Sequence, residues 1–147
     1  MTVRVAGPPL VQSLPVFDRA LLEARARRLL QELGHGTSEL SISLVGDEEM
    51  AGLNQRFRAE AAPTDVLSFS LLEGDHAAFR GELLGEVVID VEVAARQASM
   101  IGHGLDAEMA RLLIHGTLHL LGYDHQQEEE ARAMETAEDR LWAVVVA

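Results

Sequence analysis

The sequence predicts an α+β fold, with a small mixed sheet of about four strands packed with five or so helices and a metal site on a central buried helix. Two observations predict this class. Short stretches of β-branched or alternating apolar residues are interspersed with longer stretches whose apolar residues recur three and four positions apart. The last three predicted elements are all helices, so strands and helices do not alternate throughout. The 147 residues suit a single domain covering residues 1–147.

The first half of the chain predicts two strands and two helices. Residues 2–6 alternate weakly and form a short strand. Ser13, followed by a proline in the first turn, caps a helix that runs to about residue 33. Residues 40–44 alternate apolar side chains with serine, which is typical of a half-buried strand. A second helix follows over residues 47–57.

The second half predicts two more strands and three helices. Residues 66–72 and 85–91 are strands, the second of them rich in β-branched residues. Asp90 caps the helix that follows, and Asp106 caps the next one, which ends near residue 121. The last helix covers about residues 127–144, and we interpret its acidic side chains as a solvated face: Glu128, Glu129, Glu130, Glu135 and Glu138.

Composition limits the chemistry that the chain can support. There is no cysteine, so any metal must be bound by histidine or carboxylate side chains. The net charge of −12 opposes general binding to nucleic acid, although all 12 basic residues are arginine, the better residue for gripping phosphate. A bias toward arginine codons is an alternative explanation. The sequence shows no signal peptide and no apolar run long enough to span a membrane, so we expect a cytoplasmic protein.

Three histidines predict a metal centre. His115 and His119 lie four residues apart on a helix, so both imidazoles project from one face. Gly122 can adopt a left-handed conformation and end this helix, after which the chain turns back and brings His125 in as a third ligand. Three imidazoles leave a fourth position for water, which is the usual plan of a catalytic zinc site.

The alternative is a pair of structural histidines. The predicted helix is apolar nearly all round, so two unpaired imidazoles buried on it would be costly, and a shared metal explains them. The spacing of the three histidines is that of the metzincin proteases, but these enzymes carry their catalytic glutamate directly after the first histidine. This chain has Gly116 at that position, which argues against peptide hydrolysis by that mechanism.

Four segments resemble the signature of the YbeY family, which comprises bacterial metal-dependent endoribonucleases of ribosomal RNA maturation. Residues 115–125 read HGTLHLLGYDH, and residues 53–58 read LNQRFR, with phenylalanine where tyrosine is common. Residues 63–69 read PTDVLSF, and residues 84–89 read LGEVVI, with glutamate in place of the commoner aspartate. The segments occur in the family's order, and the resemblance covers roughly residues 50–142.

The resemblance implies an endoribonuclease acting on single-stranded segments of ribosomal RNA. It implies one zinc ion per chain bound by His115, His119 and His125, and a functional arginine at Arg58. The hypothetical mechanism is that metal-activated water or hydroxide attacks the phosphodiester, or enables attack on it, while Arg58 stabilises the charge of the phosphate. The ribosome or ribosomal proteins are the expected partners.

Three further side chains are candidates for supporting the ligands. Asp65 can accept a hydrogen bond from a ligand imidazole or pair with Arg58, or it can simply cap a turn. Ser68 lies in the same segment, and Asp124, beside His125, has the same alternatives as Asp65. Two other functions stay open: a non-enzymatic ribosome-associated factor with a structural zinc, and a metal-dependent hydrolase of another substrate class, including a divergent peptidase.

Overall fold

A computed structural model describes residues 2–6, 16–58, 65–70, 83–123 and 127–146 of the chain. The side chains of residues 2–6, 57 and 58 lie outside this description. The elements follow one another in the order β1 (Thr2–Ala6), α1 (Arg19–Glu32), β2 (Glu39–Val45), α2 (Asp47–Arg58), β3 (Val66–Ser70), β4 (Leu83–Asp90), α3 (Val91–Ile101), α4 (Leu105–Leu120) and α5 (Glu128–Val145).

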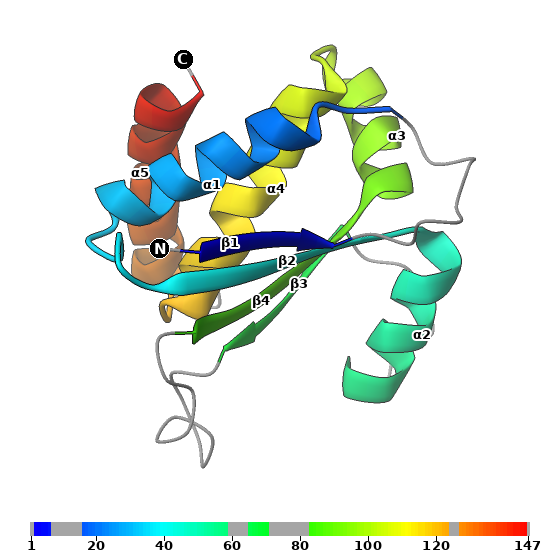
Figure 1. The fold of residues 1–147 in the computed structure, drawn as a ribbon, viewed down its shortest axis with the longest axis horizontal. Coiled ribbons are helices and arrows are strands. Elements are labelled where there is room, and N and C mark those ends of the chain that lie inside the picture. Colours follow the sequence, from blue (N-terminus) through cyan, green and yellow to red (C-terminus); the bar gives the residue numbers. More distant parts are fainter. Residues whose placement is uncertain (1, 7–15, 59–64, 71–82, 124–126, 147) are drawn as a thin grey trace.

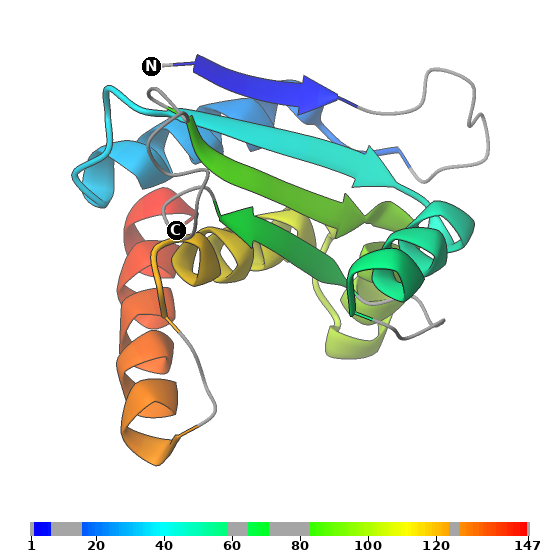
Figure 2. The same ribbon diagram turned by 90° about the horizontal axis from the view of Figure 1, so that it is seen from below.

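The described strands form one mixed sheet in the order β1-β2-β4-β3 (Figures 1 and 2). β1 pairs in parallel with β2, and β2 pairs in parallel with β4, with Ile42 opposite Val87. β3 lies at the edge and runs antiparallel to β4, with Ser68 opposite Val87. This sheet and the five described helices confirm the predicted mixture of α and β structure.

Helices cover both faces of the sheet. α1, α4 and α5 lie over one face, and α2 lies over the other (Figure 1). Alternate residues of β2 (Leu40, Ile42 and Leu44) join the larger apolar core under α1 and α4. Val45, Met50, Leu67 and Val88 form a smaller core under α2. The alternation follows from the strand repeat of two, which sends neighbouring side chains to opposite faces.

α4 lies unusually close to β3 and β4. A Cβ atom added at Gly116 would lie 2.8 Å from Cγ1 of Val87 and 3.0 Å from Cγ2 of Val66, so a side chain here would push the helix away from the sheet. The hydroxyls of Ser68 and Ser70 donate to the carbonyl oxygens of Gly116 and Leu120 at 2.8 and 3.1 Å. Two residues along a strand and four residues along a helix both cover about 6–7 Å. The second serine therefore reaches the helix one turn further along than the first.

The helix ends were predicted with mixed success. Asp90 caps α3 as predicted, because its Oδ1 accepts from the backbone N–H groups of Glu92 and Val93. The predicted cap Ser13 lies outside the described residues, and α1 begins instead at Arg19, with Asp18 as its cap. The prediction for Asp106 was wrong. Gly104 is the N-cap of α4, and the Asp106 carboxylate accepts from the backbone of Asp18 at 2.7 Å, which ties α4 to α1.

The C-terminal end of α4 was predicted correctly, and α3 ends in the same way. Gly102 and Gly122 both have the left-handed backbone conformation that glycine adopts without steric strain, with φ of 89° and 97°. Within the described part of the chain, no helix combines the length and apolar character that crossing a membrane requires.

Candidate metal centre

One line of side chains on α4 reaches solvent. From Glu108 to Leu120 every residue is buried except Arg111, His115 and His119, which are half-buried. These three residues are four positions apart, so they follow one another along one side of the helix. The remaining faces of α4 are covered by the sheet and by α1, α3 and α5 (Figures 1 and 2). The fold therefore presents two imidazoles and one guanidinium on an otherwise buried helix.

The two imidazoles converge at their Nε2 atoms. These atoms are 3.2 Å apart, and the ring planes are inclined by 76° with centroids 4.7 Å apart. Two nitrogen ligands bound to a tetrahedral zinc at about 2.0–2.1 Å are separated by about 3.3–3.4 Å. Two imidazole nitrogens approach this closely either through an N–H···N hydrogen bond or by sharing a cation. In this structure the contact is a hydrogen bond, and the same separation fits two nitrogen ligands of one zinc ion.

Glu138 lies behind the pair, on the other side of the His115 ring. Its Oε2 atom is 3.5 Å from Nδ1 of His115, and both side chains are about one quarter exposed. A carboxylate at Nδ1 favours the tautomer that carries its proton there, so Nε2 keeps the lone pair that a metal would bind. Sequence reasoning assigned Glu138 to the solvated face of the last helix, and this was wrong for Glu138, because α5 packs against α4 at this point.

The remaining predicted ligand and the arginine stay predictions. His125 and Asp124 lie outside the described residues. Among the residues that are described, no cluster of three or more histidine, aspartate or glutamate side chains suited to a metal is present. Arg58 is the last residue of α2, which covers the sheet face opposite to α4 (Figure 1), and its side chain is outside the description.

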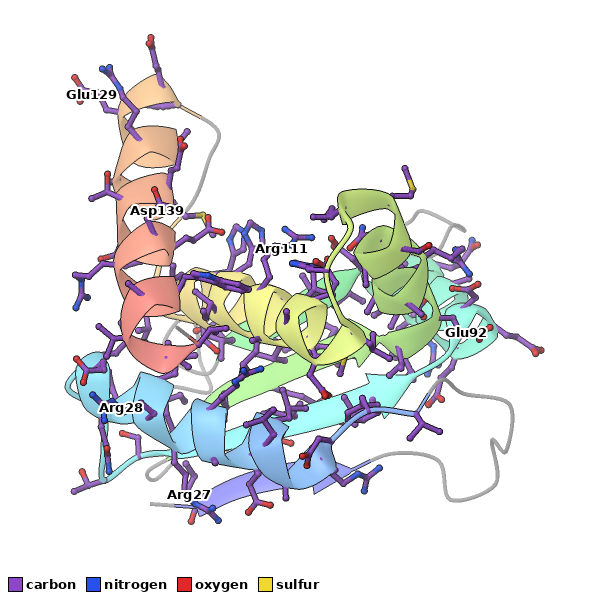
Figure 3. All side chains as sticks on the ribbon, turned by 90° about the horizontal axis from the view of Figure 1, so that it is seen from above. Arg27, Arg28, Glu92, Arg111, Glu129 and Asp139 are labelled. Atoms are coloured by element: carbon purple, nitrogen blue, oxygen red, sulfur yellow. The ribbon has the colours of Figure 1, made fainter. Side chains whose placement is uncertain are left out.

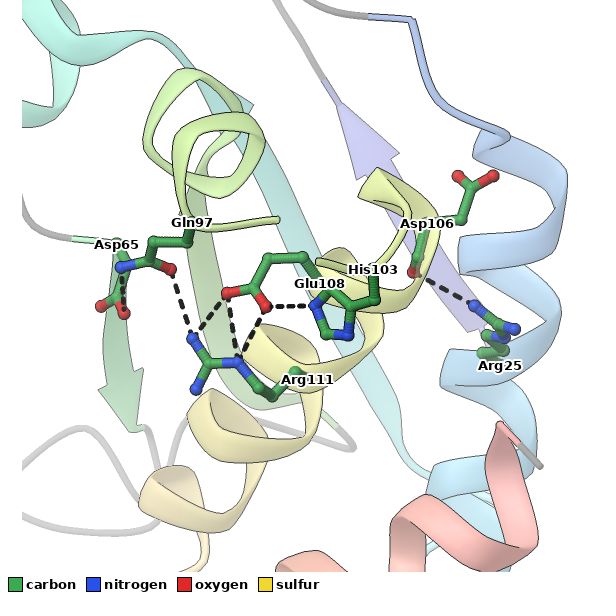
Figure 4. A network of polar contacts seen from close by, with 7 residues as sticks. All are labelled: Arg25, Asp65, Gln97, His103, Asp106, Glu108 and Arg111. Carbon is green, nitrogen blue, oxygen red and sulfur yellow. Dashed lines mark hydrogen bonds and ion pairs between the residues drawn. The ribbon is translucent and has the colours of Figure 1, made fainter. Parts of the chain in front are cut away.

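Asp65 and Ser68 contact other groups within the described structure. Ser68 donates to the backbone of α4 at Gly116, and in this way it holds the helix that carries the histidines. The carboxylate of Asp65 accepts from Nε2 of Gln97 at 3.4 Å, and its carbonyl oxygen accepts from the backbone of Asp90 at 3.0 Å. Asp65 therefore begins a polar network that leads toward α4 (Figure 4).

That network centres on Arg111 and the fully buried Glu108. Arg111 donates from Nε and Nη2 to the carboxylate of Glu108 and from Nη2 to Oε1 of Gln97. Nε2 of His103 lies 2.8 Å from the same carboxylate (Figure 4). The hydrogen bonds to Glu108 raise the pKa of Arg111, so its guanidinium stays charged. Sequence reasoning did not single out Arg111, although its position one turn before His115 was a usable signal.

The fold and this geometry define a class: a mixed α+β protein whose central helix presents two adjacent imidazoles to solvent. The sequence model of the family described as Endoribonuclease YbeY matches residues 15–145. An Endoribonuclease YbeY of Pelotomaculum thermopropionicum is 46% identical over 124 residues, which are 82% of this chain and 82% of the relative. Another, from Heliobacterium modesticaldum, is 44% identical over 131 residues, covering 82% of this chain and 79% of the relative.

A solved structure is also similar. The solution structure of a Thermotoga maritima protein matches with a TM-score of 0.59 and 27% sequence identity, covering 96% of this chain and 89% of that one. The chain belongs to the YbeY endoribonuclease family. The resemblance seen in the four sequence segments is thereby confirmed.

Proposed function

We propose that this protein is a zinc-dependent endoribonuclease that cleaves single-stranded segments of ribosomal RNA during their maturation in the cytoplasm. Membership of the family supports RNA as the substrate. The observation that carries the metal dependence is the 3.2 Å separation of the Nε2 atoms of His115 and His119, on the solvent-facing line of a buried helix.

Each residue has a defined task in this proposal. His115 and His119 would hold zinc through Nε2, and His125 would supply the third nitrogen. A zinc ion bound there supplies Lewis acidity toward water and toward the phosphodiester. Glu138, 3.5 Å from Nδ1 of His115, would orient that ring, and Arg58 would bind the phosphate and stabilise the charge that develops on its oxygens.

The surroundings of Gly116 argue against peptide hydrolysis by the metzincin mechanism. In the metzincin pattern the residue after the first histidine is the catalytic glutamate. Here that position faces the sheet, where even a Cβ atom would lie within 3.0 Å of Val87 and Val66. A carboxylate does not fit there without displacing the helix, so the metzincin mechanism has no place for its base.

The strongly acidic chain bears on how RNA is held. A net charge of −12 opposes association with a polyanion. We therefore include in the proposal that the ribosome or a ribosomal protein contributes the basic contacts that bring the RNA to the site.

The decisive experiment offers two substrates to the zinc-loaded protein. Structured RNA and casein are incubated with it, with and without a chelator. We expect the protein to cleave the RNA and not the casein. The chelator should abolish this cleavage, and added zinc should restore it. His115→Ala and His119→Ala should each lower the bound zinc and abolish cleavage. A full complement of zinc in both variants would contradict the assignment of His115 and His119 as ligands. Cleavage of casein would show that the protein is a peptidase and would contradict the proposal of RNA as its substrate.

A further inference from the structure

A cavity of about 290 Å³ lies between α4 and α5, beside the histidine pair. Its walls are formed by His103, Arg111, Ile114, Glu138, Asp139 and Trp142. Ligand pockets in proteins usually have volumes of about 300–1,000 Å³, so this one is at the small end of the range. It suits one planar ring system rather than a length of chain.

One wall of the pocket is aromatic. The rings of His103 and Trp142 are stacked, with planes inclined by 13° and centroids 6.2 Å apart. His103 is held in place by the buried carboxylate of Glu108, 2.8 Å from its Nε2. Unpaired bases of RNA are commonly bound by stacking on such rings. The wall therefore suits a nucleobase.

The rest of the lining presents a donor and acceptors together. Nε and Nη2 of Arg111 bond to Glu108 and Gln97, and among the described contacts Nη1 remains for a ligand. Glu138 and Asp139 add carboxylate oxygens from α5. Figure 3 shows Arg111 over α4 and Asp139 on α5 on the same side of the molecule. A ligand that both donates and accepts hydrogen bonds is matched by this lining.

The pocket is joined to the histidine pair. Arg111 precedes His115 by one helical turn, about 6 Å along the axis of α4. Glu138 touches both places, because it lines the pocket and contacts Nδ1 of His115. A nucleotide next to a phosphodiester bound at the histidines would have its base within reach of the pocket.

We propose that this pocket binds one nucleobase of the RNA, adjacent to the cleaved phosphodiester, and that it prefers guanine. The inference rests on the proposed function for its substrate class. Guanine presents an N1–H and an amino group that a carboxylate can accept, and also O6 and N7, which an arginine can bind. Uracil presents two carbonyl oxygens with one N–H between them. These oxygens are acceptors, so they repel the carboxylate oxygens of Glu138 and Asp139 and form no hydrogen bond with them.

The chain carries its own probe of this site. Trp142 is the single tryptophan of the 147 residues, so a base that stacks in the pocket changes its fluorescence directly. The zinc-loaded protein is titrated with the 5′-monophosphates of guanosine, adenosine, cytidine and uridine, and N-acetyltryptophanamide is titrated in parallel to subtract collisional quenching. We expect saturable quenching, with guanosine monophosphate binding about tenfold or more tightly than uridine monophosphate.

A matched pair of variants tests the role of the carboxylate. Asp139 is exposed on α5, so Asp139→Ala should fold normally, and it should weaken binding of guanosine monophosphate by about tenfold. Glu129→Ala removes the same charge from the far end of α5 (Figure 3) and should leave binding unchanged. Equal affinities for all four nucleotides, or equal effects of the two variants, would overturn the proposal.

The outcome is separable from that of the proposed function. His119→Ala should lose zinc and RNA cleavage but keep the quenching by guanosine monophosphate, because His119 does not line the pocket. If the protein binds guanosine monophosphate as described but cleaves RNA equally well without zinc, the metal mechanism is contradicted and the base pocket is supported. If RNA cleavage depends on zinc but nucleotides leave the Trp142 fluorescence unchanged, the proposed function stands and the base pocket is contradicted.

Discussion

Replacing Gly116 by alanine tests how closely α4 must approach the sheet to hold the histidines. The new Cβ atom would lie 2.8 Å from Val87, 3.0 Å from Val66 and 3.2 Å from the hydroxyl of Ser68. Val87 is fully buried, and Val66 is 9% exposed, so neither can move aside freely. We expect α4 to shift outward by a few tenths of an ångström, which carries the neighbouring His115 with it.

The magnitude can be worked out against a matched glycine. Gly52 lies inside α2, and an added Cβ would meet nothing within 4 Å, so Gly52→Ala shows the gain in helix propensity alone. That gain is about 0.5–1 kcal/mol. Overpacking a core typically costs about 1–3 kcal/mol, so Gly116→Ala should come out between neutral and about 2.5 kcal/mol less stable than the wild type.

Urea unfolding of the two variants measures this difference. In thermal unfolding, at about 2–4 °C per kcal/mol, the melting temperature should rise slightly for Gly52→Ala and fall by up to about 10 °C for Gly116→Ala. Zinc affinity should fall for Gly116→Ala only. If Gly116→Ala is stabilised as much as Gly52→Ala, the close contact between helix and sheet does not constrain the site and the reasoning fails.

Three further predictions concern single side chains. Glu138→Gln should weaken zinc binding by about 10- to 100-fold, while the exposed Glu135→Gln should not, and isothermal titration calorimetry distinguishes them. Burial and the neighbouring Asp47 carboxylate raise the pKa of Asp90 to about 7, so the folded state holds a proton that the unfolded state has released. Stability should therefore fall as the pH rises from about 4 to 7, by at most about 1.4 kcal/mol per pH unit, and Asp90→Asn should flatten that slope in urea unfolding. Arg58→Glu should keep its zinc but lose RNA cleavage, and undiminished cleavage would exclude Arg58 from the mechanism.

Local signals in the sequence predicted much of the fold. The alternation over β2 and the apolar character of α4 come from the repeats of strand and helix, so they are readable without knowing the partners. Asp90 was recognised as a cap because its side chain bonds the first turn of its own helix. Asp106 was mistaken for one because its carboxylate serves α1, a contact 88 residues away in the chain.

The candidate site was predictable only where it lies on one helix. His115 and His119 share a face of α4 by their spacing alone. Glu138 belongs to a run of acidic residues on α5, and nothing in that run shows which of them faces α4 until the two helices are packed together. The pocket beside the pair is likewise built by α4 and α5 together, so its residues could not be grouped from the sequence.

X-ray absorption at the zinc edge tests the central claim most directly. The zinc-loaded protein should show imidazole nitrogen ligands at about 2.0–2.1 Å, and His119→Ala should lose bound zinc or at least one of these ligands. A wild-type spectrum without imidazole ligands, or a His119→Ala spectrum identical to it at full zinc content, would contradict the assignment of the metal to these two histidines.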